Sequence, residues 1–228
     1  MQRLKALAAA ALAAALAACT SIEPPPDTSG PRVGVVVLHA EGSDPYGWTL
    51  PFTRSLIRQG FLTDSPEMPW SARRAYDAGV NAAMKEIDAS VARLKSRGAQ
   101  KIFVVGHSLG AAAAVGYATL RRVDGLIAIS PGYDAKGPKK AAEYLDPNGA
   151  MSYRVNAAAI RRGTPVLWVI GDTEFPGLKK AGHAAFEALP RSPPPRLVEV
   201  AAGHFDSPDF AAVLCAKWMR EIARGADS

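Results

Sequence analysis

The sequence has little cysteine, no long basic run and none of the common phosphate-binding loops. Two cysteines among 228 residues cannot build a disulfide framework. The net charge is +6, but the basic residues are scattered and no run of them interleaves with aromatic residues, so nucleic-acid binding is not expected. The nucleotide-binding motif Gly-x-x-x-x-Gly-Lys-Ser/Thr does not occur, and no dinucleotide-binding Gly-x-Gly-x-x-Gly follows a strand. No pair of residues that could bind a metal ion has a third candidate ligand nearby in the sequence. We therefore expect no cofactor and no metal ion.

The composition is that of an ordinary folded protein. Hydrophobic residues make up 48% of the chain and charged residues 21%, which excludes a disordered chain and a collagen-like or coiled-coil chain. The length favours a single domain.

The N-terminal segment is predicted to lie outside that domain. Arg3 and Lys5 precede an apolar run of alanine and leucine over residues 6–18. The run is shorter than the roughly 20 residues that span a bilayer. A short basic region followed by such a run is typical of a secretory signal peptide.

The end of the run reads Leu-Ala-Ala-Cys19 and resembles the lipobox of bacterial lipoproteins. The resemblance implies that residues 1–18 are removed and that the thiol of Cys19 carries a diacylglycerol. A plain signal peptide with an incidental cysteine is the alternative. Thr20, rather than aspartate, follows the cysteine, which in Gram-negative lipoproteins favours the periplasmic face of the outer membrane. Residues 19–31 are rich in proline, serine and glycine and predict a tether.

Strand and helix patterns alternate through residues 32–228, which we interpret as one domain. The predicted strands cover residues 33–38, about 60–63, 101–105, 125–129, 165–170 and 196–200. The predicted helices cover residues 71–97, 109–120, 178–188 and 208–223. This alternation predicts an α/β fold with a parallel sheet covered by helices on both faces. Residues 131–163 contain no strand pattern and are predicted to form a small insertion above the carboxyl ends of the strands.

One motif carries the chemistry. Residues 106–110 read Gly-His-Ser-Leu-Gly and lie between a predicted strand and a helix of small residues. Gly-x-Ser-x-Gly at such a turn is typical of a nucleophile elbow, in which the serine is strained and its neighbours must be small. Ser108 is therefore the candidate nucleophile, and the adjacent helix N-terminus favours a developing oxyanion.

With this elbow the chain resembles the α/β-hydrolases over about residues 32–225. The resemblance implies a mostly parallel central sheet, a small cap or none, and a triad in the chain order serine, acid, histidine. His204 follows the last predicted strand, where that family places its general base. The other three histidines, His39, His107 and His183, have no catalytic assignment.

The resemblance also implies positions for the acid and the oxyanion hole. Hydrolases of this type usually carry Gly-x-x-Asp after the corresponding strand, which places the acid at Glu174, with Asp172 as its rival. Either carboxylate can hold the imidazole tautomer. The backbone N–H of Leu109 is one expected oxyanion donor. The second comes from a loop that resembles the family's His-Gly-x-x, with Glu41 preferred and Ala40 as the alternative.

These residues predict a serine hydrolase, carboxylesterase-like, that cleaves small-molecule carboxylic esters or thioesters through an acyl-enzyme. Lipidated Cys19 is expected to attach it to the membrane of the cell envelope. The alternative is a non-catalytic envelope lipoprotein that uses the hydrolase fold as a binding module. Ester turnover that is lost in Ser108→Ala, without loss of folding, would distinguish the two.

Overall fold

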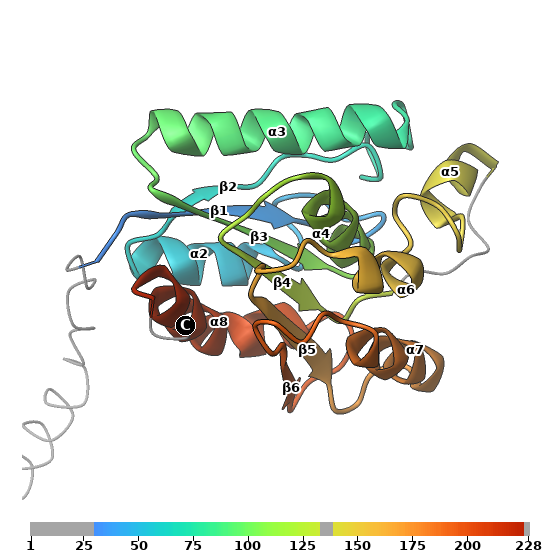
Figure 1. The fold of residues 1–228 in the computed structure, drawn as a ribbon. Helices are drawn as coiled ribbons and strands as arrows, with labels where there is room; N and C mark the ends of the chain where they lie inside the picture. The colour runs from blue at the N-terminus through green and yellow to red at the C-terminus, as the bar shows by residue number, and fades with distance from the viewer. Residues whose placement is uncertain (1–29, 133–138, 226–228) are drawn as a thin grey trace, which may run out of the picture.

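The computed structural model describes residues 30–132 and 139–225 (Figure 1). The predicted signal peptide, Cys19 and the tether up to residue 29 lie outside these residues. Within the two described ranges, no helix is long and apolar enough to cross a membrane.

Six strands form one sheet in the order β2-β1-β3-β4-β5-β6, and every neighbouring pair is parallel. The strands are β1 (Val33–Leu38), β2 (Leu62–Asp64), β3 (Lys101–His107), β4 (Gly125–Ile129), β5 (Val166–Gly171) and β6 (Arg196–Val200). Leu38 of β1 lies opposite Gly106 of β3, and His107 lies opposite Ile129 of β4. The loops after these three strands therefore meet at the carboxyl edge of the sheet.

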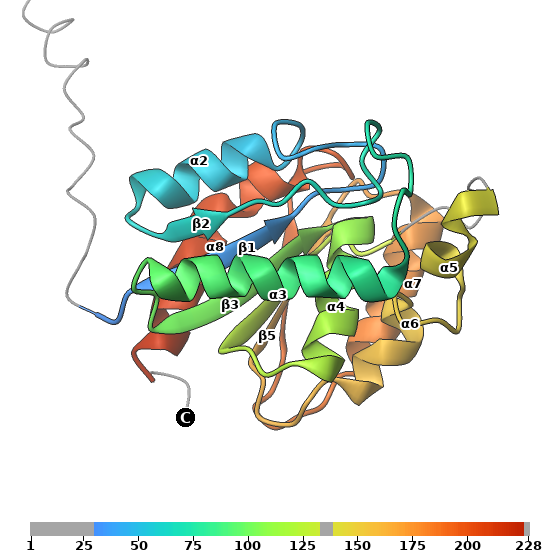
Figure 2. The same cartoon turned by 90° about the horizontal axis from the view of Figure 1, so that it is seen from above.

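Helices cover both faces of the sheet (Figures 1 and 2). One face carries α3 (Val80–Ser96), α4 (Leu109–Leu120) and α7 (Pro176–Glu187), and the other carries α2 (Leu50–Arg58) and α8 (Ser207–Ala223).

Each face of the sheet has its own apolar core. Val104 of β3 packs in the core that includes α4, whereas its neighbour Phe103 packs in the core that includes α8. The rings of Phe103 and Trp218 lie 5.9 Å apart. Because successive strand residues point to opposite faces, a strand buried on both sides must be apolar throughout. This explains the continuous apolar runs that predicted the strands.

The predicted insertion contains only short helices in its described residues, 131–132 and 139–163. These are η1 (Lys139–Ala141), α5 (Ala142–Leu145), α6 (Tyr153–Asn156) and η2 (Ala157–Ala159). In Figure 1 α5 and α6 lie toward the carboxyl ends of the strands, as expected.

One predicted boundary is wrong. The helix expected over residues 71–97 begins only at Val80. Ala75 and Tyr76, which lie inside the predicted span, have φ angles of 46° and 59°. Right-handed helices require negative φ, so the chain turns here instead.

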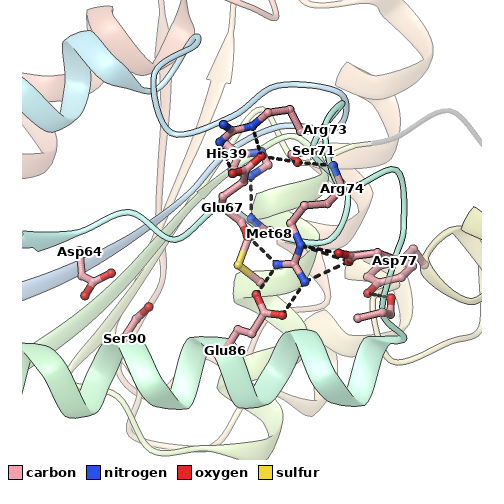
Figure 3. Close-up of polar contacts among 12 residues, drawn as sticks. His39, Asp64, Glu67, Met68, Ser71, Arg73, Arg74, Asp77, Glu86 and Ser90 are labelled. Atoms are coloured by element: carbon pink, nitrogen blue, oxygen red, sulfur yellow. Dashed lines mark hydrogen bonds and ion pairs between the residues drawn. The ribbon is translucent and has the colours of Figure 1, made fainter.

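Figure 3 shows what holds this turning segment in place. The guanidinium of Arg74 donates to the carboxylate of Asp77 at 3.0 Å and to that of Glu86, on α3, at 2.6 Å. It also donates to the backbone carbonyl of Glu67 at 2.7 Å. The Glu67 carboxylate accepts from the hydroxyl of Ser71 at 2.8 Å. Arg74 thus fastens the segment to α3 without extending the helix.

The sequence reasoning also missed α2. Its apolar residues Phe52 and Leu56 are four positions apart and fully buried, so they lie on one helical face. Pro51, in the first turn, is a common residue at a helix start and was the available signal.

Candidate active site

Ser108 occupies the sharp turn between β3 and α4. Its φ of 56° and ψ of −118° are unusual for a residue with a side chain, and such conformations cost about 1–3 kcal/mol. A Cβ on Gly106 would lie 2.0 Å from the carbonyl oxygen of Gly110, and a Cβ on Gly110 would lie 2.4 Å from that of Leu38. Both glycines of the motif are therefore required by backbone packing around the serine.

Ser108, His204 and Glu174 form a hydrogen-bonded row. Nε2 of His204 lies 2.9 Å from the Ser108 hydroxyl oxygen, and Nδ1 lies 2.8 and 2.9 Å from the two carboxylate oxygens of Glu174. All three residues are buried, with exposed fractions of 6, 8 and 6% in that order. Because a carboxylate only accepts, Nδ1 carries the ring hydrogen and Nε2 presents its lone pair to the hydroxyl. An imidazole held in this way can accept the proton of the serine.

Of the two candidate acids, Glu174 is the one that contacts His204. Burial raises the pKa of Glu174, but the hydrogen bond and charge of His204 outweigh burial, and the Phe175 N–H, at 2.7 Å, adds to their effect. The net result is a pKa below the usual value, so this carboxyl group is ionised at neutral pH. Asp172 is exposed, and its Oδ1 accepts from the N–H of Ala202 at 3.1 Å.

The loop after β1 is fixed by the buried ring of His39. Its Nε2 accepts from the backbone N–H of Met68 at 3.0 Å, so its Nδ1 carries the hydrogen and donates to the carbonyl of Ala40 at 2.8 Å. Burial lowers the pKa of His39 and keeps the ring neutral. The indole N–H of Trp70 donates to the His39 carbonyl at 2.8 Å. These contacts position the backbone that carries the candidate oxyanion donors.

The three candidate oxyanion donors lie around Ser108. Ala40 and Glu41 line the same cavity as Ser108. Leu109 is the first residue of α4, so its N–H has no carbonyl partner within the helix. The side chain of Glu41 is held by the hydroxyl of Tyr76, which donates to its carboxylate. This contact links the candidate oxyanion loop to the turning segment before α3.

A cavity of about 590 Å³ opens onto Ser108 and His204. Aromatic rings form much of its wall, and none of them was predicted as a site residue. Trp48 and Phe205 have ring centroids 4.5 Å apart, and Phe175 lies 5.5 Å from the ring of His204. All three rings are partly exposed, so they offer apolar surface to a molecule that enters the cavity.

Three further residues support the histidine loop and were missed by sequence reasoning. Nε2 of His107 donates to the backbone carbonyl of His204 at 2.6 Å. The hydroxyl of Ser207 donates to the same carbonyl at 3.2 Å and lies 2.9 Å from that of Ser130. Burial, with the nearby His204, lowers the pKa of His107 to about 3, so this ring is neutral. Of these three residues, only His107 had a signal in the sequence, namely its place beside the serine in the motif.

Among residues 30–132 and 139–225, no three His, Cys, Asp or Glu side chains gather closely enough to hold a metal ion. His183 is partly exposed on α7 and lies 3.1 Å from the carboxylate of Glu199. Cys215 is fully buried in the core beneath α8, as expected for a thiol that packs like a small apolar side chain.

Comparisons with known proteins agree with this architecture. A model of the family described as "Alpha/beta hydrolase family" matches residues 35–227. A structure described as LipS and LipT, two metagenome-derived lipolytic enzymes, has a TM-score of 0.67 at 16% identity, with 86% of this chain and 95% of that chain covered. Est1E from Butyrivibrio proteoclasticus with bound ferulic acid has a TM-score of 0.68 at 17% identity, with 89% and 93% covered.

A thioesterase domain from the curacin biosynthetic pathway has a TM-score of 0.59 at 16% identity, with 85% of this chain and 92% of that domain covered. A search of curated proteins found no match. At these identities the structural likeness establishes the shared fold.

Proposed function

This chain belongs to the alpha/beta hydrolase family, and from that premise we propose that it is a serine hydrolase of carboxylic esters or thioesters. The observation that carries the proposal is the hydrogen-bonded row of Ser108, His204 and Glu174 at the base of a cavity. Similar folds described as lipolytic enzymes and as a thioesterase domain support the same reaction class.

The proposed reaction begins at the Ser108 hydroxyl. Its single hydrogen has two acceptors within reach, Nε2 of His204 at 2.9 Å and the carbonyl of Gly132 at 3.0 Å. The oxygen attacks the substrate carbonyl carbon while the hydrogen passes to Nε2. Glu174 stabilises the resulting imidazolium. The N–H of Leu109, with that of Glu41 or Ala40, donates to the oxyanion, and loss of one such donor typically costs about 10²–10³ in rate.

The tetrahedral intermediate then collapses and expels the alcohol or thiol, which takes the proton from Nε2 of His204. The acyl group remains on Ser108. Water gives a proton to the same nitrogen and attacks the acyl carbon. The second tetrahedral intermediate then breaks its bond to the Ser108 oxygen, which takes the proton back from Nε2, so the acid is released and the hydroxyl is restored.

The cavity supports substrates of small to medium size. Its volume of about 590 Å³ falls within the range of pockets for small molecules. The rings of Trp48, Phe175 and Phe205 favour an apolar acyl or alcohol group, because rings of this kind gain from burial.

The proposed localisation depends on the N-terminal segment. Lipidation of Cys19 would attach the chain to the periplasmic face of the outer membrane. Growth with a labelled fatty acid should label the wild-type chain and leave Cys19→Ser unlabelled. Equal labelling of the two chains would contradict the proposal.

The first experiment on function is labelling with a fluorophosphonate probe, which traps a serine only when a base and an oxyanion hole activate it. The wild-type chain should be labelled and should turn over a soluble ester. Ser108→Ala and His204→Ala should do neither, while circular dichroism shows that both are folded. A folded wild-type chain that resists the probe would overturn the proposal.

A further inference from the structure

We propose that the end of the molecule opposite the active site docks on the anionic head groups of a bilayer and holds the substrate cavity toward the aqueous side. The inference concerns a surface separate from the catalytic residues. The argument from chain length rests in part on the proposed lipidation of Cys19. The argument from surface charge does not depend on it.

The amino ends of the strands and the carboxyl ends of the long helices share this end of the molecule, which we call the basic end. In Figure 1 the described chain enters there before β1, and α8 ends there. Exposed basic residues come to it from every surrounding turn. They are Arg32, Arg58, Lys95, Arg97, Arg122, Arg161, Arg162, Arg196 and Arg224.

Four of these basic residues have no carboxylate partner among the described residues. Lys95, Arg122, Arg161 and Arg162 line one hollow of about 910 Å³, and none of the four forms an ion pair with a carboxylate in the described part of the chain. Asp124 also lines the hollow but is bound by Lys101 at 3.1 Å. Helix carboxyl termini supply only about half a negative charge each, which is too little to cancel so many cations.

The opposite end carries charges of both signs. Glu41 and Arg154 line the cavity, and Lys180 lies exposed on α7. Four further carboxylates lie on the loops and helix starts at this end: Asp44, Asp172, Asp206 and Asp209. The aromatic rim of the cavity is the rival membrane-facing surface, because Trp48, Phe175 and Phe205 are partly exposed. An anionic bilayer repels the carboxylates around that rim and attracts the basic end, so the charges orient the molecule with the cavity away from the lipid.

The chain length agrees with this orientation. Gly30, the first described residue, lines a hollow at the basic end together with Arg32 and Arg224. Cys19 precedes it by only 11 residues, which span at most about 40 Å when fully extended. A lipid on Cys19 therefore keeps the basic end within reach of the bilayer. Each basic residue near an anionic surface strengthens binding about fivefold.

Introduced cysteines test the orientation in the full chain. Arg162→Cys places a thiol in the basic hollow, and Lys180→Cys, on α7, places one on an exposed position at the other end with the same loss of charge. Cys215 is buried and will not compete. Both variants are bound to vesicles of phosphatidylcholine alone or of phosphatidylcholine mixed with phosphatidylglycerol. A water-soluble maleimide is then added, and the modified peptide is identified by its mass.

We expect the Arg162→Cys thiol to react about tenfold more slowly on anionic vesicles than on neutral ones, with the difference removed by high salt. The Lys180→Cys thiol should react at the same rate on both. Slower reaction at Lys180→Cys instead would show that the cavity end docks, and equal rates everywhere would show no oriented docking. Either result would overturn the proposal, as would tight binding to a duplex DNA without binding to anionic vesicles.

A charge-reversed variant gives a second test that does not depend on an introduced thiol. Arg122→Glu, Arg161→Glu and Arg162→Glu together should weaken co-sedimentation with anionic vesicles by roughly 100-fold. Lys85→Glu, Lys139→Glu and Lys180→Glu, with the same change of net charge, should retain most of it. Equal losses of vesicle binding in the two variants would show that binding depends on net charge alone. That result would contradict docking through a specific surface. Fluorophosphonate labelling of Ser108, measured in solution on both variants, reports separately on the proposed function.

Discussion

At the scale of single residues, three buried imidazoles around the elbow are each held in one tautomer by their hydrogen-bond partners. His39 donates through Nδ1 because its Nε2 accepts from a backbone N–H. His107 donates through Nε2 to a carbonyl. His204 donates through Nδ1 to Glu174 and faces Ser108 with Nε2. Only the last of these rings is poised to exchange a proton with the serine, and the other two position backbone.

The identity of the acid can be tested by two amide substitutions. Glu174→Gln leaves His204 without a carboxylate to orient it, so we expect kcat to fall by about 10³–10⁴-fold. Asp172→Asn keeps an oxygen acceptor for the Ala202 N–H and should leave kcat near the wild-type value. Steady-state hydrolysis of a soluble ester measures both. A larger loss in Asp172→Asn would transfer the role to that residue.

His107 gives a prediction about pH. Its pKa is about 3 in the folded chain, whereas an exposed histidine titrates near 6.5. Between these values the unfolded chain binds a proton that the folded chain does not, so the free energy of unfolding falls as the pH drops below about 6.5 toward 3. His107→Gln can retain a donor for the His204 carbonyl and cannot titrate. Urea unfolding at pH 7 and pH 5 should therefore show a smaller loss in the variant; parallel losses would contradict this account.

At the scale of elements, the strands were predictable and the segments between them were only partly so. A strand such as β4, buried on both faces, is apolar at every position, and that pattern cannot be mistaken for a loop. The start of α3 was not predictable in the same way, because Ser71 has the side chain of a helix cap. Positive φ at Ala75 and Tyr76 is set by contacts with distant elements, which local patterns do not contain.

Two adjacent arginines in that segment provide a matched pair. Arg74 joins Asp77, Glu86 and the Glu67 carbonyl and is mostly covered. Arg73 is 68% exposed, and within the described ranges its hydrogen bonds and ion pair are all with Glu67. Arg74→Ala should lower the free energy of unfolding by about 1–3 kcal/mol. Arg73→Ala should lower it by at most about 1 kcal/mol.

Because the same segment supplies the Met68 N–H that orients His39, Arg74→Ala should also reduce kcat, and Arg73→Ala should not. Chemical denaturation and ester hydrolysis measure the two effects. Equal behaviour of the two variants would show that the bridge to α3 has no structural importance.

At the scale of the whole molecule, the site joins loops that are far apart in the sequence. Ser108 and His204 were predictable because their order along the chain, and their places after strands, are features of the sequence. The walls of the cavity were not, since Trp48, Phe175 and Phe205 come from three separate loops. No periodicity marks such residues, and only the folded sheet brings their loops together.

The distribution of tryptophans offers a whole-molecule measurement. Trp48 is 42% exposed at the cavity, while Trp70, Trp168 and Trp218 are at most 3% exposed. Iodide should therefore quench the fluorescence of Trp48 and little else, and Trp48→Phe should lose nearly all of the quenchable signal. A phosphonate bound to Ser108 should shield the ring and reduce quenching. Unchanged quenching in Trp48→Phe would show that another tryptophan is open to solvent.

The two ends of the described chain meet at the basic end, where a Cβ on Gly30 would lie 3.4 Å from the side chain of Arg224. An attachment to a support could therefore be made at either end of the described chain. A lipid, a surface linker or a second domain joined after residue 225 would orient the protein in the same way as one joined before residue 30. A circular permutant that closes this short gap should fold, and neither arrangement would turn the mouth of the cavity toward its support.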